Sequence, residues 1–177
     1  MDNLLNILGE YEVFTNFIPG VIFYKLSNPD IQSFVDDDNL LVFFIMCYFI
    51  GLVINRIGSL ILEPIFMKCK LIEYVDYEKY IKVGEETQKY KKTEALMKIN
   101  NLFRTLSAEF TLLFLIYLIY LPTNIKSSYI AIGYNELLHE LLFAIFAIIF
   151  ILSYRKQTKY IRKRIEFEYE RNKEKNY

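Results

Sequence analysis

The chain has 177 residues, enough for one domain, and its 21 basic residues balance 21 acidic ones, so the formal net charge is zero. Hydrophobic residues make up 54% of the sequence, which argues against an extended disordered chain, and long uncharged blocks alternate with charge-rich ones. The two cysteines, Cys47 and Cys69, show no metal-ligand spacing and no disulfide framework, which indicates free thiols in a reducing compartment.

The first two segments combine short apolar runs with polar residues. Residues 2–12 place Leu and Ile among acidic and amide residues, a pattern that fits either an amphipathic helix at the membrane surface or a frayed end. No basic run precedes an apolar core, so no cleaved signal peptide is expected. Residues 13–27 are predicted to form a first membrane span, although Pro19 interrupts them; a re-entrant segment is the alternative.

The second apolar block is the most strongly hydrophobic part of the chain. Asn39 to Ile54 carry no charge, and apolar residues continue beyond Arg56. A bilayer core about 30 Å thick is crossed by about 20 helical residues. A helix of a soluble protein would show a polar stripe, and none is present here. The block therefore predicts a span over residues 39–62 that continues as a helix into the cytoplasm.

The charged segment that follows, residues 63–105, is predicted to be cytoplasmic. Its alternation over Tyr74–Val83 is too irregular to separate a strand from a helix. From Glu85 onward apolar residues recur at helical steps, at Leu96, Ile99, Phe103, Leu106 and Phe110. This periodicity predicts one long helix whose second half spans the membrane over residues 106–122. Pro122 is expected to end it.

The last apolar block, residues 136–154, predicts a fourth span, with Asn135 as its N-cap. Helical periodicity continues through residues 155–177, where one apolar face carries Ile161, Ile165 and Tyr169. Two pairs of opposite charge at i, i+4 are predicted to join on the solvent-exposed face, namely Arg162 with Glu166 and Arg164 with Glu168. The final span is therefore predicted to extend inward as a helix.

The placement of the basic residues predicts the orientation. Of the 21, ten fall in residues 55–104 and nine in residues 155–177; the others are Lys25 and Lys126. Lys and Arg favour the cytoplasmic side of a membrane. The sequence therefore predicts one all-α membrane domain over residues 1–177. It is expected to be a bundle of about four transmembrane helices with a helical cytoplasmic extension, in the plasma membrane, with both termini inside.

Arg56 is the most informative charged residue. It is expected either to pair with Glu109, predicted at a similar depth where the third span begins, or to reach the lipid phosphates from the interface. Paired, the two residues would form a switch or a clamp. Asn55, beside Arg56, is a further candidate polar position.

Small and polar residues within the spans are candidate contact positions. Gly51 and Gly58 let a neighbouring helix approach closely, within one protomer or between protomers. Asn16 lies near Pro19 in the first span, where it lines an aqueous path or satisfies backbone groups freed by the proline.

Motifs that carry chemistry are not found. The sequence contains no H-E-x-x-H, no G-x-S-x-G and no phosphate-binding glycine-rich loop. We therefore expect a protein that is not an enzyme, with no cofactor and no metal. The basic tail could attract acidic lipids, and its interspersed glutamates make direct nucleic-acid binding unexpected.

Two segments carry a resemblance to known proteins, NFIPGVIFY near the first span and YFIGLVINRIGSLILEPI across the second. They resemble small four-span bacterial membrane proteins of antiviral-defence loci, such as the accessory membrane pore protein of type VI-B CRISPR systems and the membrane subunit of the Kiwa system. The resemblance covers about the first seventy residues. It implies a homo-oligomer that works with a soluble partner. The Arg…His motif of the CRISPR accessory family has no counterpart here, which puts that assignment in doubt.

These observations together favour a non-enzymatic membrane component of an antiviral defence system. It would oligomerise to permeabilise the membrane, or relay a membrane event to a soluble partner at the cytoplasmic face. A passive membrane anchor for a soluble effector is the alternative. A small transporter or channel unrelated to defence is a third possibility, weakened by the lack of internal repeats.

Overall fold

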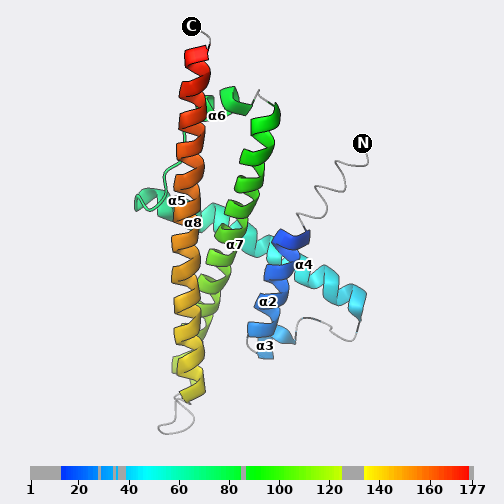
Figure 1. Ribbon diagram of the computed structural model, residues 1–177. Coiled ribbons are helices and arrows are strands. Elements are labelled where there is room, and N and C mark those ends of the chain that lie inside the picture. Colours follow the sequence, from blue (N-terminus) through cyan, green and yellow to red (C-terminus); the bar gives the residue numbers. More distant parts are fainter. Residues whose placement is uncertain are drawn as a thin grey trace.

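The computed structural model describes residues 13–27, 29–33, 35, 39–84, 87–124 and 134–175 (Figure 1). These residues are helical apart from short turns and an extended stretch at residues 72–76, with no strand among them. The predicted all-α class is thus confirmed for the described residues. The segment 2–12, predicted as an amphipathic helix or a frayed end, lies outside them.

Two helical segments contain a wide π turn, and each π turn lies just before a proline. The π segment η1 (Val13–Phe17) leads into α2 (Ile18–Leu26), which has Pro19 in its first turn. The π segment η2 (Gly58–Leu62) leads from α4 (Leu40–Ile57) into α5 (Glu63–Lys68), which has Pro64 at the same place. Because proline has no N–H to donate to the residue four positions earlier, the regular α hydrogen-bond pattern is broken at that turn.

The second helical segment is continuous from Leu40 to Lys68 and has well-defined ends. At its start the Asn39 side chain accepts hydrogen bonds from the backbone N–H groups of Leu41 and Val42, at 3.1 and 3.4 Å. At its end Lys70 adopts a left-handed backbone with φ 56°, the conformation that commonly terminates helices. The predicted continuation of this span as a cytoplasmic helix is confirmed as helical structure.

The two longest helices, α7 (Thr87–Asn124) and α8 (Tyr134–Lys175), pack against each other along their length (Figure 1). α6 (Tyr77–Gly84) packs on both near the end of the chain, and the short α3 (Pro29–Gln32) follows α2. In Figure 1 the cyan α4–α5 segment crosses the α7–α8 hairpin obliquely instead of running parallel to it. The predicted single long helix through residues 96–110 is confirmed.

Four apolar clusters hold these elements together. One joins α2, α7 and α8 around Phe110, Leu113, Phe143 and Ala147; a second joins α2 to α4 around Tyr24 and Cys47. The remaining two lie further along α7 and α8, around Tyr154 and around Val83, Ile161 and Ile165. The predicted apolar face of the tail is therefore confirmed.

Among the described residues, three helices are long and apolar enough to cross a membrane: Leu40–Lys68, Lys92–Ile119 and Leu137–Lys173. They overlap the predicted spans at residues 39–62, 106–122 and 136–154. The fourteen helical residues at 13–26 are not among them, because they are shorter than a bilayer requires. That residues 13–27 cross the membrane stays a prediction, and three candidate spans are shown where about four were expected.

Several local predictions are corrected. Pro122 does not end α7, which continues to Asn124, and α8 begins at Tyr134, so Asn135 lies inside the helix and is not its N-cap. Residues 74–76 are extended and a helix begins at Tyr77.

Both predicted ion pairs of the tail form, Arg162–Glu166 at 2.9 Å and Arg164–Glu168 at 3.1 Å. The second of them is not on the exposed face, because its side chains are only 19% and 10% exposed.

Candidate functional site

Two glycines bring the first helix into backbone contact with α4. A Cβ at Gly20 would lie 1.7 Å from the carbonyl oxygen of Cys47, and a Cβ at Gly51 would lie 1.6 Å from that of Asn16. No side chain larger than hydrogen fits at either position. The predicted role of Gly51 in close helix approach is therefore confirmed, within one protomer. This crossing also places Asn16 next to Asn55, one turn beyond Gly51 on α4.

Four side chains then form a hydrogen-bonded chain that we call the polar junction, made of Asn16, Asn55, Arg104 and Glu63. The amide nitrogen of Asn55 donates to the side-chain oxygen of Asn16 at 3.0 Å. Arg104 donates from Nη2 to the Asn55 side-chain oxygen at 3.1 Å and from Nη1 to Oε2 of Glu63 at 2.8 Å. The polar junction thus connects η1, α4, α5 and α7 through side chains that are far apart in the sequence.

Because Gly58 has no side chain, the Arg104 side chain fits beside it and contacts α4 and α5. A Cβ at Gly58 would lie 3.4 Å from Cγ of Arg104 and 3.3 Å from Cβ of Ala108. The side chains of Arg104 and Glu63 are only 15% and 19% exposed, so both charges are largely desolvated. Removing one partner of such a pair leaves an uncompensated charge, which makes the pair sensitive to any rearrangement around it.

A tyrosine pair lies beside the polar junction and joins the extended stretch to α8. The hydroxyl groups of Tyr74 and Tyr154 are hydrogen-bonded at 2.5 Å. Tyr154 is fully buried, at the end of the apolar part of α8. Burial and the hydrogen bond to Tyr154 raise the pKa of the Tyr74 hydroxyl well above its ordinary value, so this hydroxyl stays protonated at all physiological pH values.

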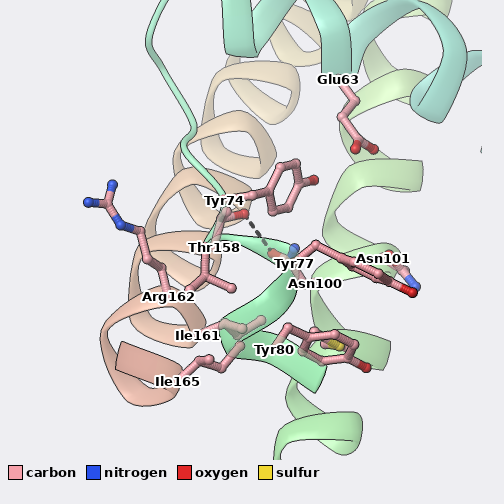
Figure 2. A pocket seen from close by; sticks show the side chains of 12 residues that line it. Glu63, Tyr74, Tyr77, Tyr80, Asn100, Asn101, Thr158, Ile161, Arg162 and Ile165 are labelled. Atoms are coloured by element: carbon pink, nitrogen blue, oxygen red, sulfur yellow. Dashed lines mark hydrogen bonds between the residues drawn. The ribbon is translucent and has the colours of Figure 1, made fainter. Parts of the chain in front are cut away.

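A cavity of about 370 Å³ opens next to the tyrosine pair, between α6, α7 and α8 (Figure 2). Its walls combine aromatic, amide and apolar side chains, among them Tyr74, Tyr77, Tyr80, Asn100, Asn101 and Ile161. Thr158 donates to the side-chain oxygen of Asn100 at 3.1 Å, the dashed bond in Figure 2. Arg162 points away from the cavity in this view and pairs with Glu73 and Glu166. The volume is in the range of small-molecule sites.

A second, smaller cavity of about 170 Å³ adjoins the polar junction. It is lined by Thr15, Asn16, Tyr48, Leu52, Asn55, Arg56 and Asn101. Asn101 lines both cavities. Members of the polar junction thus line both cavities: Glu63 lines the larger one, and Asn16 and Asn55 line the smaller one.

Of the two alternatives predicted for Arg56, the pairing with Glu109 is wrong, and the contact with lipid phosphates stays a prediction. Glu109 is fully buried, and neither of its carboxylate oxygens has a hydrogen-bond partner. Arg56 is exposed and lines the smaller cavity. Arg104 pairs with Glu63 instead. The reason is the oblique crossing of α4 over α7, which brings Glu63, one turn after Gly58, to the level of Arg104.

The other predicted positions are found at or near this site. Asn16 and Asn55 are members of the polar junction, Gly51 and Gly58 are contact points, and Pro19 is buried in the first helix. Sequence reasoning missed Arg104 and Glu63. Each is a charge at the edge of an apolar run, a signal that marks the membrane boundary but does not identify a partner on another helix.

The arrangement can hold the first helix, α4, α5 and α7 in one relative position. Within the described ranges, no group of three His, Cys, Asp or Glu side chains is placed to hold a metal ion. No protein-family model, curated protein or solved structure matches this chain.

Proposed function

We propose that this chain is a non-enzymatic membrane component of bacterial antiviral defence, which relays a change between its membrane helices and a soluble partner at its cytoplasmic extension. The polar junction is the observation that carries the proposal. It is the point where the first helix, α4, α5 and α7 are connected by side chains, and its members line both cavities. A displacement of any one helix must break or redirect one of its hydrogen bonds.

Energetic considerations support a two-state role for this site. Largely desolvated ion pairs are stable only while their geometry is kept, so a small displacement has a large free-energy effect. Glu109, one turn and a half beyond Arg104 on α7, is buried without a hydrogen-bond partner, which raises the free energy of the arrangement described here. A second arrangement that gives Glu109 a partner would remove this cost.

The larger cavity supports the choice of the cytoplasmic extension as the partner-binding part. It is open to the outside of the protein, and Tyr77 on its edge is 74% exposed. Aromatic side chains that line a partly apolar hollow are typical of protein contact sites. The assignment to antiviral defence, and to a homo-oligomer, is supported by the resemblance of the first seventy residues.

The proposal is tested by phage challenge of cells that carry the chain with its neighbouring genes, followed with a membrane-potential dye. We expect depolarisation or protection with the wild-type chain, loss of this activity in Arg104→Met and Glu63→Gln, and no change in Arg164→Met. Arg164 is the matched control because it also pairs with a glutamate, but it lies outside the polar junction and is not among the residues that line either cavity. Equal activity of all four proteins would exclude the relay.

A passive anchor predicts a different result. It would not depolarise the membrane, would tolerate both junction variants, and would lose its soluble partner when residues 155–177 are removed. The oligomeric part of the proposal is checked separately by measuring the mass of the purified chain in lipid nanodiscs; a strict monomer would contradict it.

A further inference from the structure

We propose that the smaller cavity is a binding site for the phosphate of an anionic phospholipid, with Arg56 as the cation that receives it. This inference depends on the membrane placement of the chain and not on the relay proposed above. Arg56 lines the cavity and is exposed. Among the described residues no carboxylate pairs with it, whereas Arg104, Arg162 and Arg164 each pair with a glutamate.

The lining of the cavity is suited to an anion. Among the described residues that line it, Leu52 is the one apolar residue and none is acidic. Thr15 and Asn16 are 4% and 6% exposed, so their polar side chains are held in place by the fold. Asn16 uses its side-chain oxygen to accept from Asn55, which leaves its amide N–H₂ group for an incoming acceptor.

Further donors converge on the same space. Tyr48, which carries a hydroxyl group, and Asn101, which carries an amide group, also line the cavity. Together with the Arg56 guanidinium they supply donors to several oxygens of one phosphate group. Charge-assisted hydrogen bonds of this kind are the stronger ones, and they require a negatively charged ligand.

The depth of the cavity matches the level of lipid headgroups. Asn101 precedes the predicted span of α7, and Arg56 lies near the inner end of the span over residues 39–62, whereas Tyr48 and Leu52 lie deeper in that span. The Arg56 and Asn101 end of the cavity therefore lies near the boundary of the apolar layer, where phosphates are found. An arginine at such a boundary extends its charged end toward them.

The surface next to Arg56 identifies a lipid, and not a free phosphate, as the ligand. Phe49, Val53, Arg56 and Leu60 recur at three- and four-residue steps on one exposed face of α4 and η2. The apolar members of this stripe are 61%, 40% and 73% exposed. A ligand that covers the whole stripe needs apolar chains as well as an anionic group, which is the structure of an anionic phospholipid.

The test measures lipid retention by native mass spectrometry of the full chain, released from mixed micelles of phosphatidylglycerol and phosphatidylcholine. We expect preferential retention of phosphatidylglycerol, weakened about tenfold or more in Arg56→Gln and less in Arg56→Lys, since one charged hydrogen-bonding group is worth about 1.5–3 kcal/mol. Arg155→Gln is the matched control, because Arg155 is also an exposed cation at the inner end of a span. It is expected to retain the lipid like the wild type.

Two outcomes would overturn the proposal. If Arg56→Gln retains phosphatidylglycerol like the wild type, or if Arg155→Gln loses it equally, the attraction is a property of the basic surface and not of the cavity. If inorganic phosphate alone raises the melting temperature as much as phosphatidylglycerol does, the site takes a free phosphate. The melting temperature of each variant in phosphatidylcholine verifies that the fold is kept.

Discussion

The ion pair of the polar junction allows a quantitative prediction. Arg104 and Glu63 are joined at 2.8 Å, and their side chains are 15% and 19% exposed. Two unit charges about 4 Å apart attract each other by about 4 kcal/mol at an effective dielectric constant of about 20. Because both side chains keep some contact with solvent, screening reduces this value. We therefore expect a coupling free energy of about 2 kcal/mol.

The coupling is measured with a double-mutant cycle of Arg104→Met, Glu63→Gln and the double variant, unfolded by denaturant titration in micelles. Arg104→Met is expected to cost about 3 kcal/mol, because it also removes the hydrogen bond to Asn55, and Glu63→Gln about 2 kcal/mol. The double variant should cost about 3 kcal/mol, less than the sum.

The half-exposed pair Arg162–Glu166 provides the control cycle. Its side chains are 32% and 35% exposed and lie at i, i+4 on one helix, so the expected coupling is only about 0.3–0.5 kcal/mol. If the junction pair showed no larger coupling than this control, the reasoning that a desolvated ion pair holds α5 on α7 would be refuted.

Substitutions at four further positions test other contacts by the same unfolding measurement. Gly51→Ala should lower the free energy of unfolding by about 2–3 kcal/mol, because its Cβ would lie 1.6 Å from the carbonyl oxygen of Asn16. Gly58→Ala should lower it clearly less, because the nearest atom would lie 3.3 Å from its Cβ. Equal losses in the two variants would contradict the close crossing at Gly51. Glu109→Leu should stabilise by about 1 kcal/mol or more, because it removes a buried carboxyl without a hydrogen-bond partner; a loss of stability would show that the carboxyl has one. Lys70→Gly should stabilise by about 0.5–1 kcal/mol, because only glycine adopts a φ of 56° without steric cost, and Lys70→Ala should bring no gain.

Local sequence patterns were sufficient to predict the long helices. The steps from Leu96 to Phe110 identify α7 as a single helix, since apolar residues at three- and four-residue spacing share one face whatever the helix packs on. The ion pairs Arg162–Glu166 and Arg164–Glu168 were predictable for the same reason, because i, i+4 neighbours on a helix are always close. The solvent exposure of each ion pair was not predictable, because it depends on the neighbouring helices.

Helix ends were less predictable than helices. A proline removes one hydrogen bond without preventing a helix from continuing for another turn, so α7 extends beyond Pro122. The two prolines near η1 and η2 likewise produce wide turns and not breaks. The first helix differs from the candidate spans in its length. Its short length was predictable, because the apolar run in the sequence is short.

The sequence by itself determined that α4, α7 and α8 are helical and apolar enough for a membrane, and that Asn16, Gly51, Asn55 and Gly58 are positions of interest, but it did not identify α6 as a helix. Tertiary structure alone decided that Arg104 pairs with Glu63 and that Arg56 and Glu109 do not pair. The physical reason is that partners on different helices depend on where and at what angle the helices cross. In this protein the position of the crossing is set by the backbone contact at Gly20 and Gly51, and its angle by the oblique path of α4. A sequence pattern within one segment predicts neither the position nor the angle.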